Sequence, residues 1–334
     1  MQKRFCLLLP LFIFTLSNTI NAWGIYGHKH ITHAAIFALP ADMGVFFYNH
    51  ADFLTEESAV PDVRKYTMGD KNEFPRHYIN LEAYAYTTPL AMPQDMQAAN
   101  AKYAADSLQK NGILPWYIQV MMTRLTKAFR NKNTSEILLL AGDLSHYIAD
   151  AHMPLHTTIN HNGQYTNQQG IHAFWESQLP EMFGSKYNYH TDSAQYIPDV
   201  TAAAWAIVAH TYTLADTMLQ ADQELKRVTP PEEMYELDTS GNVAHTQYGD
   251  PIHTKAYATK YNQLLHGMVE RQLRLAIQAT ANFWYTAWVN AGKPDLGSIT
   301  DQQTTERNKT YYQQDIKEWG NGHMIGLELN KEYK

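Results

Sequence analysis

Residues 133–156 read NTSEILLLAGDLSHYIADAHMPLH. The opening Asn-Thr-Ser-Glu favours the start of a helix, and apolar side chains then recur at spacings of three and four residues. Pro154 cannot continue a helix, so the sequence predicts a helix over Ser135–Ala151 that ends just before the proline. This helix carries His146 and Asp150 four residues apart, so both side chains project from one face and can reach a common ion.

The same periodicity recurs along the chain. Apolar residues repeat at helical spacing in four further segments, Asp95–Lys110, Trp116–Arg130, Val200–Leu225 and Lys255–Val289. The sequence contains no run of strand-like segments, no internal repeat and no flexible linker. It therefore predicts an all-α, multi-helix fold over residues 23–290, in one large domain or two. Residues 291–334 are polar and are expected to form a peripheral extension, partly disordered and without chemistry.

The first 22 residues have the layout of a secretory signal. Lys3 and Arg4 precede an apolar stretch from Phe5 to Leu16, and a short polar end closes at Ala22. The apolar stretch is shorter than the roughly 20 residues that a membrane-spanning helix needs. We therefore expect a secreted or periplasmic protein that is cleaved after Ala22. An uncleaved anchor or a shifted cleavage site is the alternative.

Removal of this segment changes the composition in two ways. It removes Cys6, the only cysteine, so stability must come from packing and bound metal rather than from disulfides. It also leaves 24 basic and 33 acidic residues, a formal net charge of −9. Tight binding of polyanions in general requires clustered Lys and Arg. The composition thus excludes a general nucleic-acid binder, and any attraction for phosphate must be local.

Histidine and carboxylate are the metal ligands that this composition offers. The chain has 16 histidines, and imidazole with carboxylate suits zinc. His172 and Glu176 repeat the four-residue spacing of His146 and Asp150, and His156 follows the proline break between the two pairs. One such pair alone is more often a hydrogen-bonded pair than a metal site. Three motifs within 31 residues together indicate a metal centre.

Two upstream segments add further ligand types. Asp62 and His77 supply another carboxylate and another imidazole. The segment from Trp23 to His28 reads WGIYGH and begins at the expected cleavage point, where a free α-amine and its neighbouring carbonyl can chelate zinc. The chain lacks a Gly-x-Ser-x-Gly elbow, a His-Glu-x-x-His helix and a Gly-rich phosphate loop. These absences argue against a serine esterase, a metalloprotease and a nucleoside triphosphatase.

With these motifs, the sequence resembles the superfamily of zinc-dependent phospholipase C and S1/P1 nuclease over nearly the whole mature chain. The separations agree with that superfamily, five residues from Trp23 to His28 and fifteen from Asp62 to His77. The resemblance implies a single α-helical domain that holds three zinc ions. It also implies that the mature N-terminal tryptophan is itself a ligand.

The resemblance further implies which residues bind each ion. One zinc ion would be bound by Asp62, His77, His146 and Asp150, a second by Trp23, His28 and the bridging Asp150, and a third by His156, His172 and Glu176. Closely paired zinc ions lower the pKa of a water molecule between them and supply hydroxide for attack on phosphorus, and Asp62 and Asp150 hold that pair. The ions and their carboxylates carry about +3 formally, so an acidic protein can still hold phosphate locally.

Three polar residues near these ligands are candidates for contact with phosphate. Lys65, or its neighbour Arg64, is expected to neutralise a non-bridging phosphate oxygen. An ordinary surface Arg-Lys pair is the alternative. Asn80 stands where the superfamily usually has aspartate. Its amide can donate a hydrogen bond to phosphate, but it cannot act as a base or carry charge.

The features divide between the two branches of the superfamily. The Trp-Gly-x-x-Gly-His start resembles the nucleases, whereas Glu176 and the short gap before His172 resemble bacterial phospholipase C. Tyr78 stands where the nucleases stack a base, an interaction worth roughly 1–3 kcal/mol. A tyrosine that merely packs there is the alternative. Phe74 retains one position of the choline cage of phospholipase C.

We therefore expect a zinc-dependent phosphodiesterase of the nuclease type, acting on single-stranded nucleic acid and 3′-nucleotides. A phospholipase C acting on phospholipid headgroups is the alternative, and a non-catalytic zinc-stabilised binding protein is a third hypothesis, motivated by Asn80. The expected protein is a monomer with no stable protein partner. The other histidines, including His30, His33, His152 and His161, are expected to be structural or on the surface.

Overall fold

The chain folds into helices, as the computed structural model shows for residues 24–84, 88–298 and 306–322. Within these ranges the only β-structure consists of isolated bridges between residues 235 and 253. The all-α fold expected from the sequence is therefore confirmed. The expected signal segment and Trp23 lie outside the described residues.

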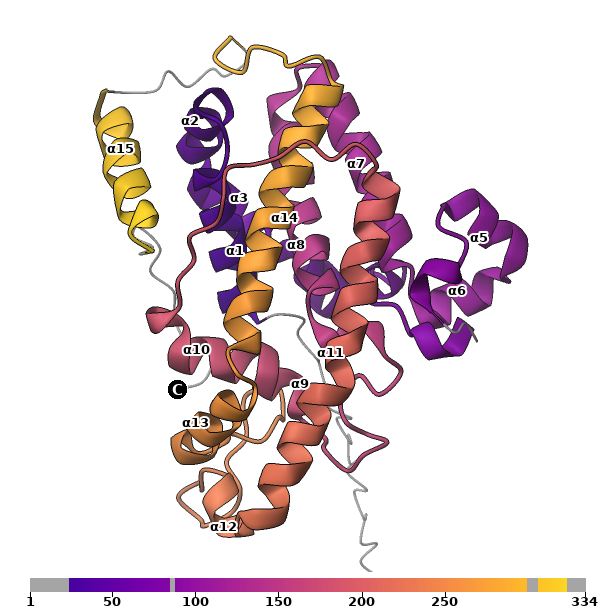
Figure 1. Cartoon of the computed structure of the whole chain (residues 1–334), viewed down its shortest axis with the longest axis vertical. Helices are drawn as coiled ribbons and strands as arrows, with labels where there is room; N and C mark the ends of the chain where they lie inside the picture. Colours follow the sequence, from indigo (N-terminus) through magenta and orange to yellow (C-terminus); the bar gives the residue numbers. More distant parts are fainter. Residues whose placement is uncertain (1–23, 85–87, 299–305, 323–334) are drawn as a thin grey trace, which may run out of the picture.

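Five long or central helices form the body of the molecule (Figure 1). They are α1 (Ile25–Phe37), α7 (Leu114–Arg130), α8 (Thr134–Ala151), α11 (Val200–Val228) and α14 (Met268–Asn290). Helix α8 packs against α1, α7 and α14, and α11 packs against α7. Because α8 has neighbours on several sides, most of its residues from Ile137 to Ala151 are buried.

Helix α8 begins and ends close to where the sequence predicts. The Asn133 side chain accepts a hydrogen bond from the backbone N–H of Glu136 at 3.2 Å and so caps the first turn. The helix ends at Ala151, and Pro154 opens the short helix η5 (Pro154–Thr157). The turn before the proline redirects the chain, which brings His156 back toward the residues of α8.

Two of the predicted helical segments are interrupted. Asp95–Lys110 forms two helices, α5 (Met96–Lys102) and α6 (Ala105–Asn111). They are separated because Tyr103 has extended backbone, and its ring packs against that of Tyr84 with the centroids 4.8 Å apart. Lys255–Val289 forms α13 (Lys255–Leu264) and α14, separated where residue 267, a glycine, adopts a φ of 75°. Left-handed or extended backbone breaks the pattern of i to i−4 hydrogen bonds, so each segment forms two helices.

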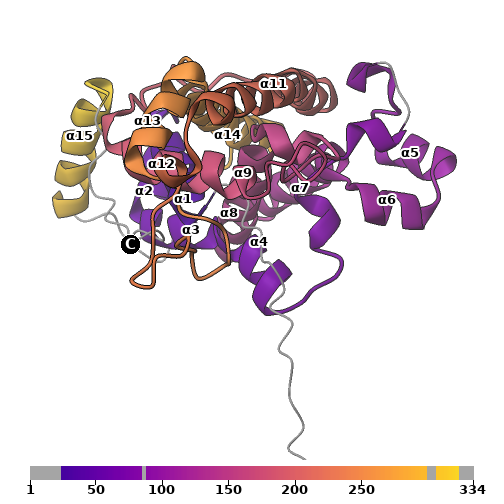
Figure 2. The same cartoon turned by 90° about the horizontal axis from the view of Figure 1, so that it is seen from below.

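Shorter elements complete the fold. Near the site lie α3 (Ala51–Glu57), α4 (Val60–Asp62), η1 (Val63–Thr67), η2 (Phe74–Arg76), η3 (Leu81–Tyr84), α9 (Ile171–Ala173), η6 (Phe174–Gln178) and α10 (Leu179–Phe183). Further away lie α2 (Ala41–Asn49), η4 (Pro89–Ala91), η7 (Gly184–Lys186), α12 (Pro231–Met234) and α15 (Glu306–Gly320). Helices α5 and α6 project from one side of the body and α15 lies on the other (Figures 1 and 2).

Helix α15 lies within the segment expected to be a polar extension, and it packs against α1 and α2. Its Tyr312 and Trp319 are buried, and the Tyr48 hydroxyl donates a hydrogen bond to Asp315 at 2.5 Å. A Cβ atom at Gly44 would lie 2.2 Å from the Tyr312 hydroxyl, so the glycine permits this close approach. The division of the chain into leader, domain and extension stays a prediction.

No helix in the described ranges combines the length and the apolar character that crossing a bilayer requires. The core is built instead from the facing sides of the central helices. Trp284 of α14 is fully buried, donates from Nε1 to the Ala141 carbonyl at 3.0 Å and stacks on Phe47 with ring centroids 5.0 Å apart. One side chain thus joins α14 to α8 and α2.

Replacing Trp284 with alanine should lower the free energy of unfolding by about 3–5 kcal/mol, because the variant loses buried apolar contacts and leaves a cavity. Chemical denaturation followed by circular dichroism measures the loss. Leu275→Ala on the same helix is the matched control: this leucine is 44% exposed, and its loss should stay within about 0.5 kcal/mol. Equal losses in the two variants would contradict the placement of α14.

Candidate metal centre

Eight of the nine predicted metal ligands lie close together where the start of α1 meets the end of α8. They form three groups, and in each group the candidate ligand atoms lie within 4.8 Å of one another. The groups are His28 with His146 and Asp150, Asp62 with His77 and His146, and His156 with His172 and Glu176. Trp23, the ninth, lies outside the described residues.

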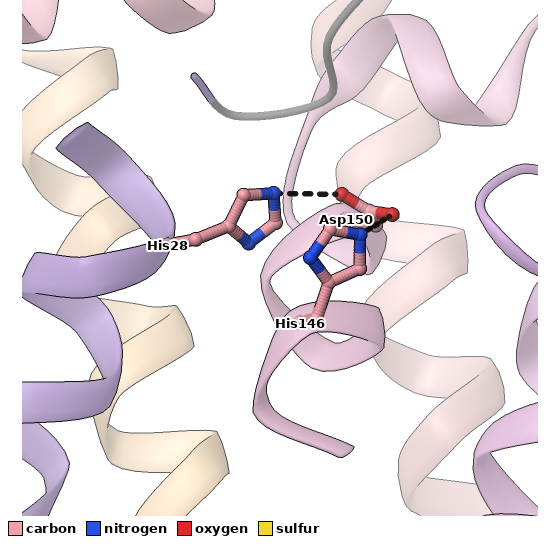
Figure 3. A group of neighbouring side chains, drawn as sticks. All are labelled: His28, His146 and Asp150. Atoms are coloured by element: carbon pink, nitrogen blue, oxygen red, sulfur yellow. Dashed lines mark ion pairs between the residues drawn. The ribbon is translucent and has the colours of Figure 1, made fainter. Parts of the chain in front are cut away.

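Helix α8 forms the base of the site (Figure 3). It places His146 and Asp150 one turn apart, with His146 Nε2 at 3.3 Å from Asp150 Oδ2. His28 reaches them from α1: its Nε2 atom lies 3.5 Å from Asp150 Oδ1, and its ring stacks on that of His146 with centroids 3.8 Å apart. The two oxygens of one carboxylate therefore face histidines from different helices.

The segment from α4 to η2 covers the base from another side. His77 directly follows η2, and its Nδ1 atom lies 2.9 Å from Asp150 Oδ2 and 3.6 Å from Asp62 Oδ1. The same nitrogen lies 3.0 Å from His146 Nε2. Asp62 ends α4, where the chain passes into the wider π-helical turn η1. Such turns are frequent at functional sites.

The third group lies beside the first two and is connected to them. His156 Nε2 lies 3.2 Å from His172 Nε2, which lies 3.0 Å from Glu176 Oε2. The other ring nitrogen of His156 lies 3.5 Å from Asp150 Oδ1. Glu176 lies on the π-helical turn η6, directly after α9. The spacing of His172 and Glu176 therefore spans a junction between two kinds of helix.

Backbone carbonyl groups fix the proton positions of two of these histidines. His146 donates from Nδ1 to the Ser58 carbonyl at 2.7 Å, and His172 donates from Nδ1 to the His161 carbonyl at 2.6 Å. In the neutral form of each imidazole, which has one N–H, the Nε2 atom carries a lone pair. Both lone pairs face the other members of their groups. This orientation by the non-ligating nitrogen is typical of metal-binding histidines.

The buried polar atoms of the site fit a bound metal. Asp150 Oδ1 and His156 Nδ1 are buried, and neither makes a hydrogen bond within the described part of the chain. Burying polar atoms without hydrogen bonds is costly unless another partner compensates. A set of imidazole nitrogens and carboxylate oxygens, with no thiolate, suits zinc. The residues present therefore fit the metal centre that the sequence predicts.

Burial also sets the charge of the imidazoles. It lowers the pKa of His28 to about 3 and that of His172 to about 4. It lowers the pKa of His156 well below its usual value as well. All three rings are therefore neutral at neutral pH, which is the form of histidine that binds metal ions.

Comparison with protein-family models finds one match, described as S1/P1 nuclease, over residues 23–279. This match covers well over half of the chain. The chain belongs to the S1/P1 nuclease family. Comparison with curated proteins finds no match. Members of this family are metal-dependent enzymes that hydrolyse phosphodiesters in nucleic acid, so this chain is a phosphodiester hydrolase of the nuclease type.

Glu73 is a feature of this nuclease that the sequence analysis missed. Its carboxylate is fully buried, and one oxygen lies 3.5 Å from His77 Nε2, the nitrogen that faces away from Asp150. Tyr147 donates to the same carboxylate, and Arg76 donates to it at 2.7 Å. Glu73 precedes His77 by four residues, the same spacing that singled out the predicted ligand pairs, so a signal for it was present.

The residues around the Glu73 carboxylate keep it ionised. Burial alone would raise the pKa of its carboxyl, but hydrogen bonds with His77 and Tyr147 hold that pKa below the usual range. An ionised carboxylate behind His77 favours the N–H on Nε2 and leaves Nδ1 free to bind a metal. Glu73 is therefore a positioning residue for a predicted ligand.

The structure gives different surroundings to Arg64 and Lys65, the two basic residues considered for contact with a phosphate oxygen. Arg64 pairs with three carboxylates, Glu57 at 3.6 Å, Glu73 at 3.3 Å and Asp143 at 2.7 Å. Its guanidinium is thus engaged by a carboxylate cluster behind the metal site. Lys65 is buried and points the other way, with its ammonium 3.4 Å from Asp62 Oδ1.

Lys65 keeps its positive charge despite burial. Burial would lower the pKa of its ammonium, but Tyr66 and the carboxylates of Asp62 and Asp150 raise that pKa above its usual value. The Lys65 ammonium also lies 4.4 Å from the centre of the Tyr66 ring. A permanent cation therefore stands beside the predicted ligand Asp62.

A cavity of about 290 Å³ lies next to the groups of predicted metal ligands. Four residues predicted to contact substrate line it: Lys65, Phe74, Tyr78 and Asn80. The predicted ligands His77, His156 and His172 also line it, together with Tyr66, Lys110, Leu155 and His161. Arg64 is not among these lining residues, in agreement with its carboxylate partners.

The histidines expected to be structural fall into two groups. His30 and His152 are buried and donate from Nδ1 to the backbone carbonyls of Tyr26 and Ile148, and His33 is also buried. His161 is exposed and lines the cavity, and its own carbonyl orients His172. The spacing of the motifs did not predict that the His161 side chain lines the cavity while its carbonyl orients His172.

Replacing Glu73 with glutamine should lower the zinc affinity about 10–100-fold, because the neutral amide no longer fixes the His77 ring by its charge. Competition with a chelator measures the affinity. Asp143→Asn is the control, because it removes another carboxylate partner of Arg64 and leaves the contact between Glu73 and His77 in place. Equal affinities in the two variants would contradict the positioning role.

Proposed function

We propose that this chain is a secreted three-zinc nuclease that cleaves single-stranded nucleic acid and also hydrolyses 3′-nucleotides. The observation that carries the proposal is the position of Asp150. Its Oδ2 atom faces His77 and His146, and its Oδ1 atom faces His28 and His156. A carboxylate that is shared in this way supports a cluster of neighbouring ions rather than a single one.

The third proposed ligand set is the group of His156, His172 and Glu176, and the first two sets divide the residues of the other two groups. One zinc ion is bound by Asp62, His77, His146 and Asp150, a second by Trp23, His28 and Asp150, and a third by His156, His172 and Glu176. The short distances within each group support this assignment. Bound zinc supplies an activated water nucleophile and neutralises charge on the phosphate.

The residues around the cluster hold the substrate. The Lys65 ammonium, at 3.4 Å from Asp62, is positioned to bind a non-bridging phosphate oxygen next to the metal site. The Asn80 amide lines the same cavity and is able to donate a second hydrogen bond to phosphate. Tyr78 offers its ring for stacking against a base.

The charge of the cavity favours a nucleic acid over a choline phospholipid. Its lining includes Lys65 and Lys110, and no lining residue carries a carboxylate. A trimethylammonium headgroup is bound by aromatic rings together with acidic groups, whereas a phosphate is bound by cations. Phe74 lines the cavity, which the alternative of a phospholipase C requires. The same cavity is lined by Lys65 and Lys110, whose ammonium groups suit an anion.

Secretion is the remaining part of the proposal. Residues 1–22 have the layout of a signal peptide, and cleavage after Ala22 would expose the amine of Trp23. The family match begins at residue 23, which supports this boundary. The nearest predicted ligand, His28, lies on the first helix after that point. Export and completion of the metal site would then be one event.

Cleavage of single-stranded DNA by the zinc-loaded chain 23–334 should fall at least about 100-fold in His146→Ala. Even a residue that only orients a ligand contributes 10–100-fold, and His146 is itself a ligand in the proposal. Initial rates on single-stranded DNA, a 3′-nucleotide and a phosphocholine ester measure activity and preference. His210→Ala, an exposed histidine on α11, is the matched control.

Cleavage that survives His146→Ala would contradict the ligand assignment. Turnover of the phosphocholine ester without cleavage of DNA would favour phospholipase C. Zinc binding without turnover of any of the three substrates would favour the non-catalytic binding protein.

A chain that retains Ala22 should bind fewer zinc ions than the chain that begins at Trp23, because its N-terminal amine is moved away from the site. Elemental analysis after dialysis measures zinc per chain, and N-terminal sequencing of the exported protein identifies the cleavage point. The same zinc content and nuclease activity in both chains would contradict the role of the Trp23 amine.

A further inference from the structure

The end of helix α6 forms one wall of the substrate cavity. Tyr78 donates from its hydroxyl to the Lys110 carbonyl at 3.1 Å, and its own carbonyl accepts from the Leu114 N–H at 3.2 Å. Asn80 donates from its backbone N–H to the Asn111 carbonyl at 2.7 Å. Three hydrogen bonds therefore join the segment that carries the predicted substrate residues to the end of α6 and the start of α7.

Gly112 allows these two segments to approach closely. It has a φ of 84°, which residues with a side chain rarely adopt. A Cβ atom at this position would lie 2.0 Å from the Tyr78 carbonyl oxygen and 2.7 Å from Cδ2 of its ring. The absence of a side chain at Gly112 thus permits the observed position of Tyr78.

The Tyr78 side chain reaches from the metal site to the backbone of Lys110. The backbone of this residue follows His77 at the metal site, and its hydroxyl end reaches the carbonyl of Lys110. Lys65 is buried at the metal end of the cavity beside Asp62, whereas Lys110 is exposed and lines the cavity at the far end of the ring. A nucleotide whose base stacks on Tyr78 therefore lies in a cavity that is lined by both lysines.

We propose that Lys110 binds a second phosphate of the substrate, the one next along the strand from the cleaved phosphodiester, on the Tyr78 side. This inference rests on the proposed function, because it requires a nucleic-acid strand that is cleaved at the metal site. One lysine then serves each of two successive phosphates. The nuclease would select strands with several phosphates over substrates with a single one.

Kinetics on two substrates test the role of Lys110. Initial rates are measured for a tetranucleotide, which has three internal phosphates, and for a dinucleoside monophosphate, which has one. Lys110→Gln should reduce the ratio of kcat/KM for the longer to the shorter substrate about fivefold, the upper range for an exposed ion pair. It should also reduce the slope of log(kcat/KM) against log salt for the longer substrate by about 0.7.

Two further variants separate the effect of the Lys110 charge from the effect of the position of the Tyr78 ring. Lys102→Gln on the neighbouring helix α5 removes the same charge from a residue outside the cavity lining, so it should leave the substrate ratio and the salt slope as in the unaltered chain. Gly112→Ala displaces the Tyr78 ring without removing charge. It should lower kcat/KM for both substrates and keep the wild-type salt slope.

The outcomes distinguish this inference from the proposed function. If the unaltered chain cleaves both substrates and Lys110→Gln behaves like Lys102→Gln, the second phosphate site is wrong and the nuclease function stands. If the unaltered chain cleaves neither substrate, the proposed function fails and the inference fails with it. An equal loss on both substrates in Lys110→Gln would assign Lys110 to the cleaved phosphate and overturn the proposal.

Discussion

The buried carboxylate of Asp150 is the constraint on which the rest of the structure depends. It has no exposure to solvent, and a buried carboxylate is costly without compensating partners. Burial would raise its pKa, but His146 and His156 hold that pKa well below the usual value, so the group is ionised. Histidines from α1, η5 and the segment after η2 converge on it. The packing of these segments against α8 is therefore also the assembly of the metal site.

Around this carboxylate, a second layer of residues fixes the imidazole rings. Backbone carbonyls at Ser58 and His161 orient His146 and His172, and the Glu73 carboxylate lies behind His77. The carbonyl groups belong to short connecting segments, where the backbone is not occupied by helical hydrogen bonds. The irregular parts of an otherwise helical protein thus orient the ligands that the long helices supply.

The charge distribution explains how an acidic protein can act on a polyanion. The whole chain has a formal charge of −7, yet the cavity is lined by lysines and histidines without a carboxylate. Two nearby acidic residues that are not predicted ligands, Glu73 and Asp143, pair with Arg64 behind the site. This separation keeps the attraction for phosphate local, although acidic residues outnumber basic ones in the whole chain.

The sequence by itself determined the all-α class, the boundaries of α8 to within one residue at its start, and the spacing of the ligand pairs. These features depend on neighbours three or four residues apart, and local periodicity records them. Only the tertiary structure separated Lys65 from Arg64 and joined the Tyr78 hydroxyl to the backbone of Lys110. The tertiary structure also determined the break between α5 and α6, where the Tyr103 ring packs against the Tyr84 ring. Each of these depends on contacts between segments that approach only after folding, and the period of one helix carries no information about them.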